Sequence, residues 1–167
     1  MITIPDIMAA VVRGVRTKDE RDMLREQINE LEAALFHSDP KIFDDILTAR
    51  LPKNTTDAMR EIFARPEFKG NTQALRNFFQ NLRDTLDTFS LLKINIAFKP
   101  SEQMIDRLHE WTQQNLGLGV ALDINYDGSI LGGARIIFGG KYKEMTLAQM
   151  ITDALGKEKI AVLGMIK

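Results

Sequence analysis

The sequence predicts a helical bundle followed by a small α+β domain, because the spacing of its apolar residues changes near residue 91. Before that point apolar residues recur every three or four positions, which is typical of amphipathic helices. After it, apolar and polar residues alternate, which is typical of strands with one buried face. We therefore expect a helical domain over residues 1–88 and an α+β domain over residues 89–167, with a mixed sheet of three or four strands.

The helical half shows its clearest pattern over residues 19–36, whose apolar stripe opposes a charged face. Further helices are expected over residues 41–51, 55–64 and 71–89, and a shorter one after Pro5, because proline-, glycine- and asparagine-containing breakers separate these stretches. The stripe consists of Leu24, Ile28, Leu31 and Leu35. Phenylalanines at spacings that suit a bundle core are Phe36, Phe43, Phe63, Phe68, Phe78, Phe79 and Phe89.

The α+β half begins with a strand over residues 91–99, in which every second residue is apolar. Pro100 ends this strand, and Ser101 is placed to cap a helix that follows. The inner stripe of that helix is predicted to consist of Ile105, Leu108, Thr112 and Leu116, with Trp111 alongside.

The next predicted elements are a strand over residues 118–124, a turn over 126–129 and a strand over 130–138. Gly139 and Gly140 then form a two-residue hairpin turn with positive φ angles, and the chain returns through residues 141–144. Thr146 is expected to cap a last helix that ends near Leu155. The apolar run after residue 157 fits a strand, a helix or a partner contact equally well.

Composition limits the functions that the chain can have. Its 167 residues include 22 basic and 23 acidic side chains, so the net charge of −1 offers no overall attraction to nucleic acid or an anionic membrane. The absence of cysteine excludes disulfides, thiolate chemistry and cysteine-ligated zinc. The longest apolar runs are too short to span a bilayer.

Candidate catalytic residues are sparse, and each has a simpler structural interpretation. Gly132 and Gly133 are predicted to lie inside a strand and the second glycine pair at a hairpin tip, whereas a phosphate-binding loop joins a strand to a helix. His37 and His109 fall in different predicted domains. Asp123 and Asp127 bracket a turn, where carboxylates accept backbone hydrogen bonds.

One basic cluster stands out, but it is mixed with acidic residues that cancel most of its field. We interpret it as a solvated helix face rather than a nucleic-acid site. Its basic members are Arg13, Arg16, Lys18, Arg21 and Arg25, and its acidic members are Asp19, Glu20, Asp22 and Glu26.

The ordered elements of residues 91–155 resemble the C-terminal domain of the delta subunit of F-type ATP synthases, the oligomycin-sensitivity-conferring protein of mitochondria. That family has a serine- or asparagine-led Leu-Ile-Gly-Gly strand, then a glycine-bearing hairpin, then a helix. The residues that occupy these places here are Ser129, Ile130, Leu131, Gly132, Gly133, Gly139, Gly140, Thr146 and Leu147. The helical half resembles the family's N-terminal bundle in kind and is shorter.

The resemblance implies a non-catalytic peripheral-stalk connector, or stator, without cofactor or metal. Its helical domain would hold alpha, and possibly beta, subunits of the catalytic head, and its α+β domain the C-terminal helix of a b-type stalk subunit. It would sit peripherally at the cytoplasmic face of a bacterial inner membrane. Two alternatives stay open: a regulatory or nucleic-acid-binding α/β module, and a small hydrolytic or phosphotransfer enzyme built on His109, Asp123 and Asp127.

Overall fold

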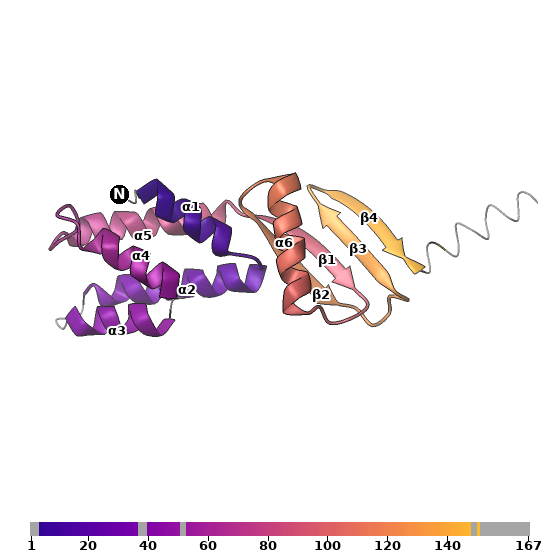
Figure 1. Cartoon of the computed structure of the whole chain (residues 1–167), viewed down its shortest axis with the longest axis horizontal. Coiled ribbons are helices and arrows are strands. Elements are labelled where there is room, and N and C mark those ends of the chain that lie inside the picture. The colour runs from indigo at the N-terminus through magenta and orange to yellow at the C-terminus, as the bar shows by residue number, and fades with distance from the viewer. Residues whose placement is uncertain (1–3, 37–39, 51–52, 148–149, 151–167) are drawn as a thin grey trace, which may run out of the picture. The chain divides into compact units, whose positions relative to one another are not determined.

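The computed structural model describes residues 4–36, 40–50, 53–147 and 150 (Figure 1). The chain divides into two compact units. One comprises the residues up to Ser90 together with Trp111–Ala121, and the other comprises Leu91–Glu110 together with the residues from Leu122 onward.

The helical part contains five helices among the described residues, which confirms the predicted bundle. The predicted bounds differ from the observed ones by one or two residues, because helix ends are fixed by caps that periodicity does not show. These helices are α1 (Ile4–Gly14), α2 (Lys18–Ala34), α3 (Pro40–Arg50), α4 (Lys53–Phe63) and α5 (Thr72–Asp87).

Two of the helices begin at well-formed caps. Thr17 accepts a hydrogen bond from the Glu20 backbone N–H, and the Glu20 carboxylate accepts one from the Thr17 N–H, so α2 starts with a reciprocal capping box. The Asn71 side chain accepts from the Ala74 N–H at 3.0 Å and starts α5. These contacts satisfy N–H groups that have no partner within the helix.

The core of the bundle contains most of the phenylalanines that the sequence indicated. Phe63 is the hub, with ring centres 5.6 Å from Phe43 and Phe78 and 5.8 Å from Phe79. Edge-on contacts at such distances add to the stability gained by burial. The prediction for Phe36 was wrong: this side chain is 62% exposed, and the Arg76 guanidinium lies 5.1 Å from its ring centre. Phe36 follows α2, just beyond the end of its buried stripe.

The second part is a strand-helix-strand unit followed by a hairpin, which confirms the predicted mixed sheet. The strands lie in the order β2-β1-β3-β4. The Ser90 N–H donates to Gly119 and the Asp127 N–H to Ile96, so β1 and β2 run parallel, whereas β3 is antiparallel to β1 and β4. The elements are β1 (Ser90–Ile96), α6 (Glu102–Leu116), β2 (Val120–Tyr126), β3 (Gly133–Phe138) and β4 (Lys141–Thr146).

Helix α6 begins as predicted, because the Ser101 hydroxyl accepts a hydrogen bond from the Met104 N–H at 3.3 Å. Of its predicted inner stripe Thr112 is fully buried, and Ile105, Leu108 and Leu116 are half-buried. Trp111, predicted alongside this stripe, is exposed. His109 is buried, as its predicted place beside the packed face requires.

Three sequence-based boundaries were wrong. Strand β3 begins at Gly133, so Gly132 lies before the strand and Gly133 opens it rather than lying inside it. Strand β2 continues to Tyr126, which the sequence had placed in the turn. Phe98 is exposed beyond the end of β1, because strand pairing stops at Ile96 and the chain then turns toward Pro100.

Thr146 is the last residue of β4, and the predicted helix after it lies, apart from Leu147 and Met150, outside the described residues, as does the run after residue 157. His37 also lies outside them. None of the helices in the described ranges is long and apolar enough to cross a membrane.

Candidate interaction surfaces

Asp127 and Asp123, two of the candidate catalytic residues, occupy structural positions. Asp127 forms a tight turn: its backbone carbonyl accepts from the Ile130 N–H at 3.2 Å, and its carboxylate accepts from the Ser129 N–H and hydroxyl. These Ser129 hydrogen bonds hold the pKa of Asp127 below its ordinary value. Asp123 accepts from the Asn125 amide on the same strand. In the ranges that the structure describes, no cluster of three or more histidine and acidic residues could hold a metal ion.

Gly133 is the glycine of the motif with the strictest steric requirement. Its φ of +87° is rarely adopted by residues with a side chain, and an added Cβ would lie 2.0 Å from the Met145 carbonyl oxygen. Gly132 also has a positive φ, and it accepts a hydrogen bond from the Leu147 N–H at 3.1 Å. The motif therefore brings the start of β3 against the end of β4, and its glycines allow close backbone packing.

The second glycine pair forms the hairpin turn that the sequence predicted. Gly139 and Gly140 have φ angles of +55° and +73°, and the residues on either side of them, Phe138 and Lys141, are paired across β3 and β4. Two consecutive positive φ angles match the right-handed twist of the strands.

The hairpin places a polar network on one face of the sheet. Arg135 lies 3.3 Å from the Asp127 carboxylate and 3.4 Å from that of Glu144. Glu144 also accepts hydrogen bonds from the Tyr142 and Thr146 hydroxyls, at 2.7 and 2.8 Å. Hydrogen bonds from Tyr142, Thr146 and Arg135 lower the pKa of Glu144, and the same Glu144 contact raises the pKa of Tyr142.

Sequence reasoning missed this network, although a signal for it was present. A two-residue turn at Gly139 and Gly140 pairs residues that are equally distant from it, and this rule places Arg135 opposite Glu144. Opposite charges facing each other across two strands attract.

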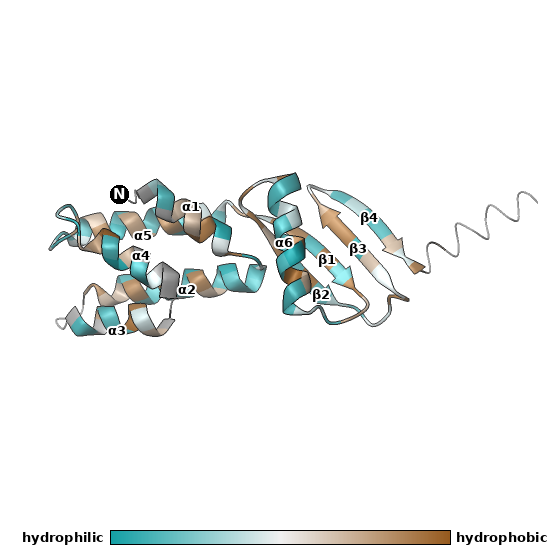
Figure 2. Ribbon diagram, in the orientation of Figure 1, coloured by the Kyte–Doolittle hydropathy of each residue, from teal (hydrophilic) through white to brown (hydrophobic). Residues whose placement is uncertain are grey.

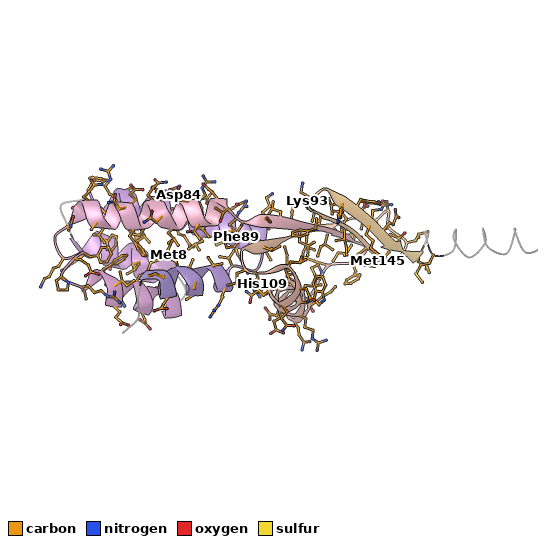
Figure 3. All side chains as sticks on the ribbon, turned by 90° about the horizontal axis from the view of Figure 1, so that it is seen from above. Met8, Asp84, Phe89, Lys93, His109 and Met145 are labelled. Carbon is orange, nitrogen blue, oxygen red and sulfur yellow. The ribbon has the colours of Figure 1, made fainter. Side chains whose placement is uncertain are left out.

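The two faces of the sheet differ in character. We call the face that carries Lys93, Arg135 and Glu144 the open face, and the face that carries Ile94 and Ile136 the α6-side face. Figure 3 shows Lys93 on the side of the sheet opposite α6. The open face also carries the exposed side chains of Ile137 and Tyr142, so it combines an ordered polar network with apolar surface.

Several ion pairs lie on the surface of the helical part. The basic cluster around α2 is neutralised as the sequence suggested, because Arg16 pairs with Glu20, Arg21 with Asp22 at 2.7 Å and Arg25 with Asp87 at 3.1 Å. Burial alone would raise the pKa of Glu20, but hydrogen bonds from Arg16 outweigh it and hold that pKa below its ordinary value. This pairing leaves little positive field for a nucleic-acid backbone.

A second group of charges joins α2 to α5. Glu32 contacts Arg83 and lies 3.6 Å from Arg76, and the hydrogen bond from Arg83 lowers the pKa of Glu32. Arg76 also lies over Phe36. Phe36 and Met23 are large apolar side chains that lie exposed on this part of the chain.

No family model matches this chain, and no curated protein matches it. Among solved structures it is similar to a chain in the cryo-EM structure of the Toxoplasma gondii mitochondrial ATP synthase hexamer, at 15% sequence identity and a TM-score of 0.35. The similarity covers 96% of this chain and 98% of that one. A likeness this weak decides neither fold nor function.

Proposed function

We propose that this protein is a non-catalytic connector of a rotary F-type ATP synthase, which joins the catalytic head to a membrane-anchored stalk. The helical domain, residues 1–88, holds alpha and beta subunits of the head, and the α+β domain, residues 89–167, holds the C-terminal helix of a b-type subunit. The complex places the chain at the cytoplasmic face of a bacterial inner membrane.

The observation that carries this proposal is the ordered motif that residues 129–147 share with the delta subunit family. In the structure these residues form one local unit: a turn, a close approach of backbones at Gly133, and a hairpin closed by Gly139 and Gly140. A glycine that must pack against a neighbouring backbone is a specific requirement, so its position within the motif is informative. This supports the assignment of the α+β domain, and the helical bundle before it agrees with the family's domain order.

The surfaces suit binding rather than chemistry. A connector that resists rotation needs durable interfaces, above about 1,000 Å² of buried area each, rather than a reactive group. Both parts of the chain carry apolar side chains exposed to solvent, including Phe36 and Met23 on one and Ile137 and Tyr142 on the other. Aromatic residues and methionine are enriched in protein interfaces.

The test is recovery of partner subunits with a tagged full-length chain purified from its native membranes. We expect alpha, beta and b-type subunits in constant proportions. Gly133→Ala introduces a backbone clash in the α+β domain, and we expect it to lose the b-type subunit while keeping alpha. Gly140→Ala is the matched control, because it also has a positive φ but no atom within 4 Å of the added Cβ.

Recovery of the chain alone would contradict the proposal. Salt-sensitive recovery of nucleic acid instead would favour the nucleic-acid-binding alternative.

A further inference from the structure

The turn after β2 contains a dipeptide with a chemistry of its own. Asp127–Gly128 is the one place in the sequence where an aspartate or asparagine precedes a glycine. At such a step the backbone nitrogen of the glycine can attack the carboxyl carbon of the aspartate. Glycine has no Cβ to obstruct the approach or to restrict the backbone, so this dipeptide reacts most readily.

The reaction needs no enzyme, oxidant or cofactor. A bond forms between the Gly128 nitrogen and Cγ of Asp127, a carbon–oxygen bond of the carboxyl group breaks, and the amide proton leaves with the hydroxyl as water. Water then opens the cyclic imide. Opening at Cγ restores aspartate, whereas opening at the main-chain carbonyl leaves isoaspartate, in which the backbone runs through the side chain.

The structure holds the reacting carboxyl group at both oxygens. Oδ1 of Asp127 accepts hydrogen bonds from the Ser129 N–H at 3.0 Å and from the Ser129 hydroxyl at 2.5 Å. The other oxygen, Oδ2, lies 3.3 Å from Nη1 of Arg135. Attack requires the carboxyl carbon to turn its face toward the Gly128 nitrogen, so a group bound at both oxygens must first lose these contacts.

The backbone on either side of Asp127 is held as well. The Asp127 N–H donates to the Ile96 carbonyl at 2.9 Å, and the Asp127 carbonyl accepts from the Ile130 N–H at 3.2 Å. These two bonds fix the main-chain angles that closure of the imide ring must change.

Ionisation adds to this restraint. The neutral carboxylic acid is the reactive form, because hydroxide leaves a carbonyl carbon more readily than oxide does. Hydrogen bonds from the Ser129 hydroxyl and N–H stabilise the carboxylate and hold the pKa of Asp127 below its ordinary value. The side chain is therefore ionised at neutral pH, which leaves little of the reactive form.

Arg135 connects this restraint to the hairpin. Figure 2 shows β3 as a mostly hydrophobic strand, and Arg135 is its one charged residue. The same guanidinium lies 3.4 Å from Glu144 of β4, so its position depends on the pairing of the two strands. Separation of β3 from β4 would therefore remove part of what holds Asp127.

We propose that Asp127–Gly128 is a modification site at which isoaspartate forms spontaneously, and that the contacts from Ser129 and Arg135 suppress this reaction in the folded chain. Isomerisation lengthens the backbone at the end of β2 and displaces the carboxylate that binds Ser129, so it marks molecules in which the turn has opened. This inference does not depend on the proposed role in an ATP synthase.

The test follows isoaspartate at residue 127 of the full-length chain over time, by peptide mapping with a mass-spectrometric fragmentation that distinguishes the two isomers. We expect the folded chain to form it at least about tenfold more slowly than the chain unfolded in urea, because the reaction awaits local opening. Equal rates would overturn the restraint, and no isoaspartate at this residue in the unfolded chain would overturn the site itself.

Ser129→Ala removes the hydroxyl contact at an exposed position and should raise the rate in the folded chain about threefold to tenfold, the effect of one lost hydrogen bond. Ser129→Thr keeps the hydroxyl and should retain the slow rate. An unchanged rate in Ser129→Ala, or equal acceleration in Ser129→Thr, would contradict the role of the hydroxyl.

Gly128→Ala added to Ser129→Ala is the matched control. The φ of Gly128 is not in the left-handed region, and the atom nearest to an added Cβ is the hydroxyl of the exposed Tyr126 side chain, at 3.0 Å. The extra methyl group should obstruct attack and return the rate to a low value. A rate as fast as that of Ser129→Ala alone would contradict attack by the Gly128 nitrogen.

Discussion

The two parts of this molecule close their cores in different ways. In the helical part, aromatic rings from α3, α4 and α5 meet around Phe63, and helices surround them. In the sheet, α6 covers β1 well, but the same face becomes progressively exposed toward β4. A bundle can therefore close its core with contacts between neighbouring helices, whereas a sheet needs as many covering elements as its width demands.

The largest expected effect comes from the centre of the bundle. Phe79→Ala should lower the free energy of unfolding of the helical part by about 3–5 kcal/mol, because Phe79 is fully buried and truncation leaves a cavity. Amide exchange in α2 and α5 measures the effect region by region. Phe36→Ala is the control, with an expected change within about 0.5 kcal/mol since Phe36 is exposed. Similar losses in both variants would show that the ring cluster does not carry the core.

The corresponding weak point of the sheet is a backbone contact rather than a side chain. Gly133→Ala should destabilise the sheet by about 2–5 kcal/mol, which combines about 1–2 for the positive φ with about 1–3 for overpacking against Met145. Gly140→Ala incurs the first cost alone. Thermal unfolding of the two variants should differ clearly, and equal melting temperatures would remove the argument for close packing at Gly133.

A smaller effect is expected at the start of α2. Thr17→Ala should cost about 1 kcal/mol, because it leaves the Glu20 N–H without its capping acceptor. Thr17→Ser keeps the hydroxyl and should retain most of that stability in urea unfolding. If the serine variant were as unstable as the alanine variant, the hydroxyl contact would not be the cause.

The smallest expected effect is the pH dependence of the ion pair between Glu32 of α2 and Arg83 of α5. Arg83 lowers the pKa of Glu32 in the folded state, so this stabilisation is present above the ordinary value of 4.5 and is lost as pH falls through the lower folded pKa. Glu32→Gln should therefore flatten the acid limb of the stability curve measured by urea unfolding. Glu26→Gln, at an exposed position of the same helix, should leave that limb unchanged.

The sequence predicted the elements better than the surfaces they form. Periodicity located α2 and β1 because burial of one face imposes a repeat of 3.6 or 2 residues. The spacing of the phenylalanines placed Phe36 in the core, because spacing alone does not show that α2 ends before this residue. The start of β3 was misplaced because Gly133 is defined by its contact with Met145, twelve residues away, and not by local pattern.

The candidate surfaces were harder to predict from the sequence. The glycine pair at the hairpin was predicted from its spacing, and the Arg135–Glu144 pair follows from the same turn once the register is known. The decreasing burial across β3 and β4 depends on how wide α6 is relative to the sheet, which no linear pattern contains.

The most direct test of the connector role is lysine-specific cross-linking in intact native membranes, read by mass spectrometry. The helical part carries Lys18 and Lys69, and the sheet carries Lys93, Lys141 and Lys143. We expect the first group to link to alpha or beta subunits and the second to a b-type subunit. Links from both groups to unrelated proteins, with none to these subunits, would contradict it.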